Sequence, residues 1–393
     1  MVRPLSQLAL AAVLASSAFA AAGCASMTTS SQAEHRLRDE IRDRGVDPDT
    51  VIVPFALSDE MRTWMDANIQ HAGSAEEKLK GLLRSIVSNA GGLGVSYQAD
   101  FTVTAADVFR THRANCLSFT NLFVAMAREL GVDVYFLLVE DLQSFAREGD
   151  LVVVSDHMTA AYGQPPDRMV LDFTPGEVRE YRETRELSDL VAVAMYYTNR
   201  GAGFLRAGDE RSAVEWLDVA VKLAPELAGA WTNLGVARRR TGDLEGAEVA
   251  YRRALETDAT ALSAYQNLAA LLRLRGQEQE ANDLLALTAR RDNRNPFTFL
   301  DLGDLSLRYG RFDEAEGYYR RALRLDHEGP EPYAAIGILR INTGKTKDAV
   351  NWLRKAQDRD PKNDRVLRLE RLIERVQSEG KQERRAGNPS SGG

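Results

Sequence analysis

Cysteine and histidine are both scarce in this chain. Only two cysteines, Cys24 and Cys116, and five histidines occur among 393 residues. So few cysteines exclude a disulfide-rich scaffold. One internal thiol and scattered histidines also lack the spacing of a metal site. We therefore predict no metal and no other cofactor.

An excess of positive charge is missing as well. The formal net charge is -7 and the isoelectric point is near 5.5, which gives no electrostatic reason to expect nucleic acid as a partner. The hydrophobic content of 44% fits neither a disordered chain nor a fibrous one. The length is sufficient for two or three globular domains.

Residues 1 to 23 have the features of a targeting segment. Arg3 provides a positive start, residues 8 to 22 are apolar and small, and the run is too short to span a membrane comfortably. The ending Ala-Ala-Gly-Cys at 21 to 24 resembles the bacterial lipobox. The resemblance implies cleavage before Cys24 and lipidation of that residue. Ala18-Phe19-Ala20 offers an alternative site for ordinary secretion.

The lipobox resemblance also carries an expectation of location. Ala25 stands where the family's signal for retention in the inner membrane would be aspartate. We therefore expect an exported protein, anchored by lipid in the outer membrane and facing the periplasm. Residues 24 to 57 are interpreted as a tether and lead-in.

Residues 113 to 131 place a thiol at the start of a helix. Cys116 follows a short polar stretch, and Gly131 supplies a stop. Unpaired N–H groups and the positive end of the helix dipole favour the thiolate form of cysteine at such a position. The alternative is that Cys116 is a small buried hydrophobe. The helix is indicated by apolar residues at intervals of three and four: Leu117, Phe119, Leu122, Phe123, Met126, Ala127 and Leu130.

Helices are also expected upstream, and strands downstream, of this segment. Ser58, Ser74 and Thr104 are predicted N-caps. The strands are predicted at residues 132–139, 151–154, 157–162 and 169–173, with a turn at 163–167 joining the last two. A helix that leads into an antiparallel sheet defines an α+β domain.

Pairing of the last two strands brings His157 close to Asp172. Their antiparallel arrangement predicts that His157 lies opposite Asp172 or Phe173, or one place away. Alone, His157 is more simply a core histidine, and Asp172 a cap for the turn at Thr174. With Cys116 they supply a nucleophile, a base and a carboxylate that orients the base.

The oxyanion of such a reaction also needs donors. The backbone N–H of Cys116 is the first candidate. Tyr97 and Gln98, near the glycine-rich break before Cys116, are weaker candidates.

Residues 58 to 175 resemble the transglutaminase-like superfamily of papain-type thiol proteins. The matching segments are Arg-Ala-Asn-Cys-Leu-Ser-Phe around Cys116, Ser-Asp-His-Met-Thr-Ala around His157, and Val-Leu-Asp-Phe-Thr-Pro around Asp172. The resemblance implies a papain-like domain over 58–185 with a Cys-His-Asp triad. Met158 and Leu171 replace the aromatic residues that the family often has beside the histidine or before the aspartate.

The second half of the chain repeats with a period of 34 residues. Such periodicity is typical of tetratricopeptide repeats, each a pair of helices. We predict five repeats over 194–363, a capping helix at 364–378 and a disordered tail at 379–393. The repeating columns are Gly208, Gly242, Gly276, Gly310 and Gly344; Ala213, Ala247, Ala281, Ala315 and Ala349; Gly201, Gly235, Ala269, Gly303 and Gly337; and Tyr197, Trp231, Tyr265, Phe299 and Tyr333.

The first helices of such repeats line a concave face. This resemblance implies a peptide or protein ligand there. Asparagine can donate to and accept from a peptide backbone, and arginine favours carboxylates. The alternative is an ordinary solvated face. The candidate binding residues are Asn199, Asn233, Asn267, Arg206, Arg239, Arg240, Arg273 and Arg308.

The sequence thus predicts an α+β transglutaminase-like (papain-like) domain followed by an all-α tetratricopeptide-repeat solenoid. The favoured function is action on peptide amide bonds, as a protease or amidase, coupled to a binding array. A non-catalytic adaptor is one alternative. True amine transfer is another, because the same acyl-thioester serves both hydrolysis and transfer.

Overall fold

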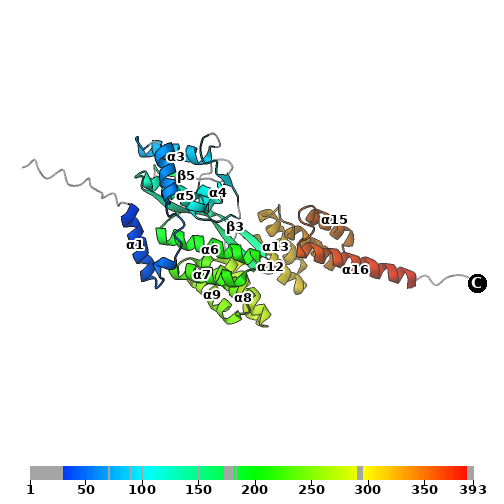
Figure 1. Ribbon diagram of the computed structural model, residues 1–393. Helices are drawn as coiled ribbons and strands as arrows, with labels where there is room; N and C mark the ends of the chain where they lie inside the picture. The colour runs from blue at the N-terminus through cyan, green and yellow to red at the C-terminus, as the bar shows by residue number, and fades with distance from the viewer. Residues whose placement is uncertain are drawn as a thin grey trace, which may run out of the picture.

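The computed structural model describes residues 30–69, 71–88, 91–98, 101–148, 151–165, 167–171, 181, 184–289 and 295–386. The predicted signal peptide, Cys24 and Asp172 lie outside these ranges. Within them the chain forms an α+β unit followed by an array of helix pairs (Figure 1). No helix in this part of the chain is both long and apolar enough to cross a membrane.

The α+β unit contains short helices and two small sheets. Its helices are α1 (Ser30–Asp43), η1 (Pro48–Thr50), α2 (Asp59–Asn68), α3 (Ala75–Val87), α4 (Ala105–Thr111) and α5 (Cys116–Glu129). Its strands are β1 (Ser96–Tyr97), β2 (Arg113–Ala114), β3 (Val134–Glu148), β4 (Leu151–Tyr162), β5 (Met169–Leu171) and β6 (Thr184–Leu187). β1 and β2 are parallel, whereas the larger sheet is antiparallel with the order β5-β4-β3-β6.

The predicted helix starts are confirmed. The side chains of Ser58, Ser74 and Thr104 accept hydrogen bonds from the first-turn N–H groups of α2, α3 and α4. Ser74 and Glu77 form a complete capping box. These caps come from local sequence, which is why they were predictable.

The strand prediction needs correction around the β3–β4 hairpin. The strand predicted to end at residue 139 continues as β3 to Glu148, and the two strands predicted at 151–154 and 157–162 are one strand, β4. Pairing runs from Val134↔Tyr162 to Val139↔His157 and resumes at Ser144↔Ser155 after an irregularity. Ser155 pairs with Ser144, so the strand continues through a polar stretch that looked like a break.

Helix α5 packs on one face of the larger sheet. The Arg128 guanidinium lies 5.5 Å from the Phe136 ring centroid, and its Nε donates to the Val134 carbonyl oxygen at 3.0 Å. Phe136 pairs with Ala160, and both belong to the core that contains most of α5. The face of the sheet that carries Phe136, Met158 and Ala160 is therefore the face toward α5.

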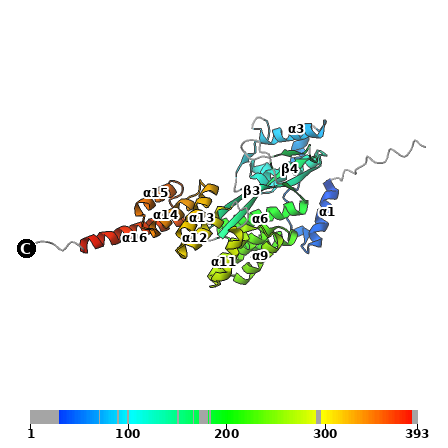
Figure 2. The same ribbon diagram turned by 180° about the vertical axis from the view of Figure 1, so that it is seen from behind.

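Five helix pairs and a final helix follow the sheet (Figures 1 and 2). The pairs are α6 (Asp189–Ala207) and α7 (Glu210–Leu223), α8 (Ala228–Arg240) and α9 (Leu244–Thr257), α10 (Leu262–Leu274) and α11 (Glu278–Ala289), α12 (Pro296–Arg308) and α13 (Phe312–Leu325), and α14 (Glu331–Asn342) and α15 (Thr346–Gln357). The last helix is α16 (Asp364–Ala386). The array thus begins at Asp189 rather than at 194.

The repeating glycines have two separate roles. A Cβ built on Gly235 would lie 2.4 Å from the Tyr251 ring, and one on Gly303 would lie 2.3 Å from the Tyr319 ring, so these glycines let paired helices approach closely. The Gly208 column has positive φ values, from 70° to 88°, with nothing within 4 Å of an added Cβ. Those glycines end the first helix of each pair in the left-handed conformation.

The final helix is longer than predicted. It continues past residue 378 to Ala386, so the predicted tail begins later than 379, and residues 387–393 lie outside the described ranges. Most residues between 379 and 386 are good helix formers, and α16 extends without a stop signal strong enough to end it. Arg365 anchors the start of α16 by donating to both carboxylate oxygens of Asp304, each at 2.8 Å.

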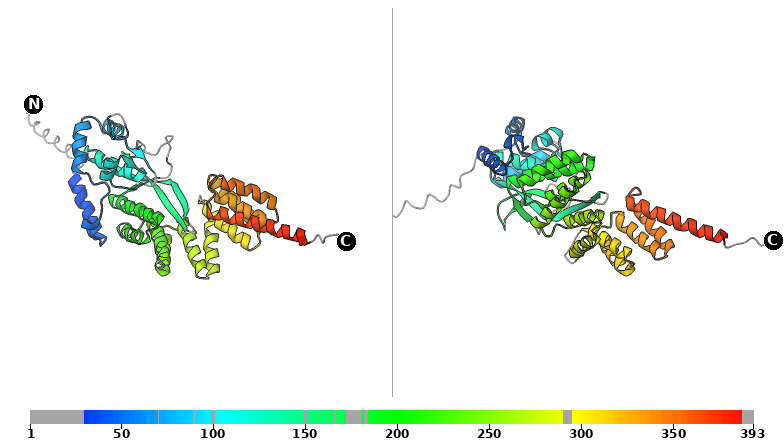
Figure 3. Two further views of the ribbon diagram at one scale, coloured as in Figure 1. Left: turned by 45° about the vertical axis from the view of Figure 1, so that its right-hand side comes forward. Right: turned by 90° about the horizontal axis from the view of Figure 1, so that it is seen from below.

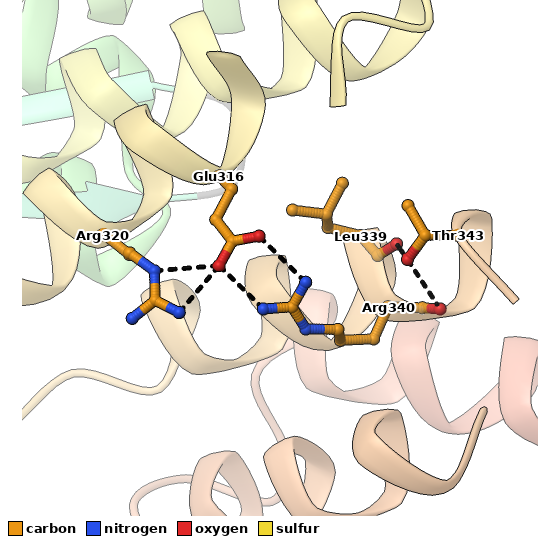
Figure 4. A network of polar contacts seen from close by, with 5 residues as sticks. All are labelled: Glu316, Arg320, Leu339, Arg340 and Thr343. Atoms are coloured by element: carbon orange, nitrogen blue, oxygen red, sulfur yellow. Dashed lines mark hydrogen bonds and ion pairs between the residues drawn. The ribbon is translucent and has the colours of Figure 1, made fainter. Parts of the chain in front are cut away.

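A carboxylate with two arginine partners joins the fourth and fifth pairs (Figure 4). Arg340 on α14 donates to both oxygens of Glu316 on α13, at 2.9 and 2.8 Å, and Arg320 donates to one of them. Hydrogen bonding by Arg340, with a further contribution from Arg320, lowers the pKa of Glu316 to about 2.

Candidate thiol site and repeat face

Asn115 fixes the start of the cysteine helix. It is 6% exposed, and its Oδ1 accepts from the Ser118 N–H at 2.9 Å while its Nδ2 donates to Thr102 Oγ1 at 2.7 Å. Cys116 follows as the first residue of α5, a free and half-buried thiol. The prediction of a helix that begins at Cys116 is therefore confirmed.

The loop that precedes α4 forms hydrogen bonds to the first turn of α5. Ser118 is fully buried, and its hydroxyl accepts from the Val103 N–H at 2.8 Å and lies 3.3 Å from the Phe101 carbonyl oxygen. With the Asn115–Thr102 bond, these contacts hold the turn on two sides.

The two weaker oxyanion candidates, Tyr97 and Gln98, lie beside Ala114, two residues before Cys116. Tyr97 pairs with Ala114 in the small parallel sheet, and Tyr97 is 45% exposed. The Gln98 N–H donates to the Ala114 carbonyl oxygen at 2.8 Å, and Gln98 Oε1 accepts from Arg113 Nε at 2.6 Å. The Nε2 amide is the group that Gln98 can still offer to a ligand.

His157 lies on β4, where it pairs with Val139 and is 9% exposed. Its ring centroid is 6.3 Å from that of Tyr181. The irregularity in the β3–β4 pairing begins at the next step of the ladder. Irregularities of this kind are frequent beside functional sites, where they alter the direction of side chains.

Thr120 connects the cysteine turn to the strand that carries His157. It is fully buried on α5, and its hydroxyl lies 2.8 Å from the Cys116 carbonyl oxygen and 3.2 Å from the Met158 carbonyl oxygen. The structure thus brings the first turn of α5 to the residue that follows His157. Sequence reasoning missed Thr120, although its position four residues after Cys116 placed it on the same side of the helix.

The alternation of side chains along β4 decides which face of the sheet carries His157, and so affects whether His157 can contact Cys116. Met158 belongs to the core that includes α5, on the face of the sheet toward that helix. Successive side chains of a strand point to opposite faces, so His157 lies on the other face, with Val139.

The third member of the predicted triad lies outside the described residues. The predicted antiparallel pairing of β4 with β5 is confirmed, and within the described residues it runs from Tyr162↔Met169 to Ala160↔Leu171. Thr159 also donates through its hydroxyl to the Leu171 carbonyl oxygen. Asp172 is the next residue, and its role stays a prediction.

The first repeat is tied to the α+β unit at two points along its first helix, the start and the middle. Arg128 at the end of α5 donates to both carboxylate oxygens of Asp189 at the start of α6, at 2.7 and 2.9 Å. Arg200, farther along α6, donates to the Thr102 carbonyl oxygen at 3.2 Å. Thr102 also bonds to Asn115, so a repeat helix supports the turn before Cys116. Sequence alone gave no signal for these long-range pairs.

The predicted asparagine column is mostly covered. Asn233 and Asn267 are 1% and 0% exposed, whereas Asn199 is half-buried. Neither Asn233 nor Asn267 lies on a solvated face, so the alternative of a solvated face does not hold for these two residues.

The arginines predicted to bind a ligand differ in their burial and in their hydrogen bonds. Arg206 and Arg308 are exposed and Arg239 is half-buried, while Arg240 Nη1 donates to the Leu205 carbonyl oxygen at 2.8 Å. Arg273 is partly buried near Glu278, and desolvation lowers its pKa. Arg308 Nη1 lies 3.9 Å from a carboxylate oxygen of Glu278.

Nothing in the described residues groups histidine, cysteine and carboxylates into a metal-binding cluster.

Two stretches of the chain, residues 198–264 and 306–373, match family models described as tetratricopeptide repeat. No curated protein matches the chain. The chain therefore carries tetratricopeptide repeats, as its period of 34 residues predicted.

Several solved structures are similar to part of the chain, and two of them are described as TPR proteins. One is pilF of Pseudomonas aeruginosa, with 25% identity and a TM-score of 0.40, covering 48% of this chain and 86% of that one. A thermophilic TPR protein of Thermus thermophilus has 21% identity and a TM-score of 0.40, covering 46% and 98%. YrrB, described as a TPR protein with an unusual peptide-binding site, has 18% identity and a TM-score of 0.33, covering 45% and 92%.

Proposed function

We propose that this protein acts on peptide amide bonds through Cys116, in a transglutaminase-like domain coupled to repeats that bind a peptide or protein. The proposal rests on the thiol at a capped helix start, on the order of Cys116, His157 and Asp172, and on the repeats. No cofactor enters this chemistry.

In the proposed reaction the Cys116 sulfur attacks the amide carbonyl and its proton passes to the His157 imidazole. The backbone N–H of Cys116 faces the developing oxyanion. Collapse breaks the C–N bond, the amine leaves with the proton held by His157, and an acyl-thioester remains on Cys116. Water then releases the acid and restores the thiol. Asp172 would orient the imidazole.

The single observation that carries the proposal is the position of Thr120. Its contacts with the carbonyl oxygens of Cys116 and Met158, at 2.8 and 3.2 Å, join the nucleophile turn to the strand of His157. Met158, the neighbour of the proposed base, is therefore in contact with the helix that begins at Cys116, which supports the proposal.

A second candidate function is a non-catalytic adaptor, in which the repeats bind and the first domain only supports them. The observation that favours it is the strand alternation, which puts His157 on the face of the sheet away from the body of α5. The ties from Arg128 to Asp189 and from Arg200 to Thr102 would then serve rigidity alone.

Alkylation of Cys116 separates the two candidates. We expect iodoacetamide at neutral pH to modify Cys116 faster than free cysteine, and Cys116→Ala to remove the labelled peptide. An alkylation rate no faster than that of free cysteine would contradict the catalytic proposal and favour the non-catalytic adaptor. Adding a primary amine during peptide turnover and identifying the product by mass spectrometry separates hydrolysis from amine transfer.

The proposed location is the periplasmic side of the outer membrane, with Cys24 lipidated. It rests on the sequence of residues 1–25. Metabolic labelling with a fatty acid should mark the protein, and Cys24→Ser should abolish the label. Continued release as a soluble secreted protein without label would instead support cleavage after Ala20.

A further inference from the structure

The distal part of the β3–β4 hairpin leaves the sheet and reaches the repeats. We call residues 140–148 and 151–156 the arm; it begins beyond the pair Val139↔His157. Its strands pair with each other from Ser144↔Ser155 to Glu148↔Leu151. β4 contacts α8 and α10, the first helices of the second and third repeats. Figure 3 shows the hairpin extending from the sheet to these helices.

Helix geometry identifies which face of α8 the asparagine occupies. Gly235 faces Tyr251 of the paired helix α9, since an added Cβ would lie 2.4 Å from that ring. Asn233 comes two residues earlier, about 200° around the helix. It therefore lies on the face of α8 that points away from α9, which is the concave side of the array.

Burial along the asparagine column follows the contacts of β4. Asn233 on α8 and Asn267 on α10 are 1% and 0% exposed. Asn199 holds the same position on α6 but is half-buried. The two buried positions lie on the helices that β4 contacts, and α8 and α10 also contact each other.

The side-chain amide of Asn233 lacks hydrogen-bond partners. Both its Oδ1 and its Nδ2 are buried without a hydrogen-bond partner. A buried amide in this state is unfavourable, because it has lost its bonds to water and gained no partner. An extended peptide with a free N–H and C=O at this place would satisfy both atoms.

We infer that the arm is a resident, displaceable occupant of the concave face of the second and third repeats, and that the partner is an extended peptide segment that takes its place and bonds through its backbone to Asn233. This inference rests on the proposed binding role of the repeats and specifies how that role is regulated. His157 pairs with Val139 at the base of the arm, so displacement of the arm changes the strand next to the proposed base. Binding and the thiol site are coupled through β4.

The labelling rate of a thiol placed on the concave face tests directly whether the arm covers that face. Asn233→Cys, Asn267→Cys and the matched control Asn199→Cys are each made in a Cys24→Ser, Cys116→Ala background. Each is labelled with a maleimide in the intact chain and in a chain whose residues 140–156 are replaced by Asn-Gly, a turn that suits the pair Val139↔His157. We expect removal of the arm to speed labelling at 233 and 267 by at least about tenfold, and at 199 by much less. Equal rates with and without the arm would overturn the inference.

A second measurement uses the intact chain, in case the shortened chain does not fold. A benzophenone amino acid in place of Asn233 is photoactivated, and the linked peptides are identified. Crosslinks to residues 151–156 support the inference, and crosslinks confined to α9 contradict it. A synthetic peptide of residues 148–156 should bind the shortened chain at least about tenfold more tightly than the intact one. These outcomes do not depend on Cys116 reactivity, so they stand apart from the alkylation test.

Discussion

The guanidinium of Arg128 and the carboxylate of Asp189 form a two-point ion pair, at 2.7 and 2.9 Å, between the helix that begins with Cys116 and the first helix of the repeats. Both side chains are 23% exposed. The α+β unit and the repeat array are therefore joined by a specific, partly buried contact.

Asp189→Asn should weaken this junction. We expect the free energy of unfolding to fall by about 1–3 kcal/mol, because a charge-assisted pair with little exposure is lost. Denaturant unfolding measures it. The control is Glu256→Gln, which removes an ion pair with Arg253 whose side chains are 63% and 61% exposed; its effect should stay below about 1 kcal/mol. Equal effects of the two variants would show that the junction contributes no more than a surface pair.

Gly235→Ala should destabilise the second repeat. The new Cβ would lie 2.4 Å from the Tyr251 ring, and overpacking of this kind lowers the free energy of unfolding by about 1–3 kcal/mol. Gly203→Ala is the matched control on α6, because nothing lies within 4 Å of its added Cβ. There the gain in helix propensity should stabilise by up to about 1 kcal/mol. The same sign for both variants, measured by thermal unfolding, would refute the close-approach role.

Glu316 should make stability depend on pH below its ordinary titration range. Its folded pKa is about 2, below the ordinary value of 4.5, because Arg340 and Arg320 bond to the carboxylate. A lowered folded pKa stabilises above the unfolded pKa, and this contribution is lost as pH falls from 4.5 toward 2. Glu316→Gln should therefore flatten the acid limb of the unfolding profile between these values. An unchanged profile would mean that other carboxylates govern acid unfolding.

Asn115→Ala should affect both stability and Cys116. Loss of the cap to the Ser118 N–H and of the bond to Thr102 should lower the free energy of unfolding by about 1–2 kcal/mol. The turn would loosen, so alkylation of Cys116 should slow as well. Asn115→Asp keeps an acceptor for Ser118 and should retain most of the stability. If Asn115→Ala alkylates at the wild-type rate, the cap has no part in activating the thiol.

The helices and their starts could be predicted because they depend on local sequence. Ser58, Ser74 and Thr104 cap the predicted helices, and the period of 34 residues predicts the repeats. The arm could not be predicted, because Ser155 joins the strand only through its pair with Ser144. The burial of Asn233 depends on packing between distant segments, which a repeat pattern does not contain. The Thr120 contacts and the Arg128–Asp189 ion pair also join distant segments, so the sequence did not predict them.

Whether Cys116 and His157 meet is the most direct test of the catalytic account. His157→Cys is made in a Cys24→Ser background and oxidised mildly, and linked peptides are sought by mass spectrometry. A disulfide requires Cβ atoms about 4 Å apart, and Met158→Cys is the control for the opposite face of β4. The account predicts a rapid link between Cys116 and the new thiol at 157. A link formed only by the variant at 158, with both thiols free in the variant at 157, would contradict it.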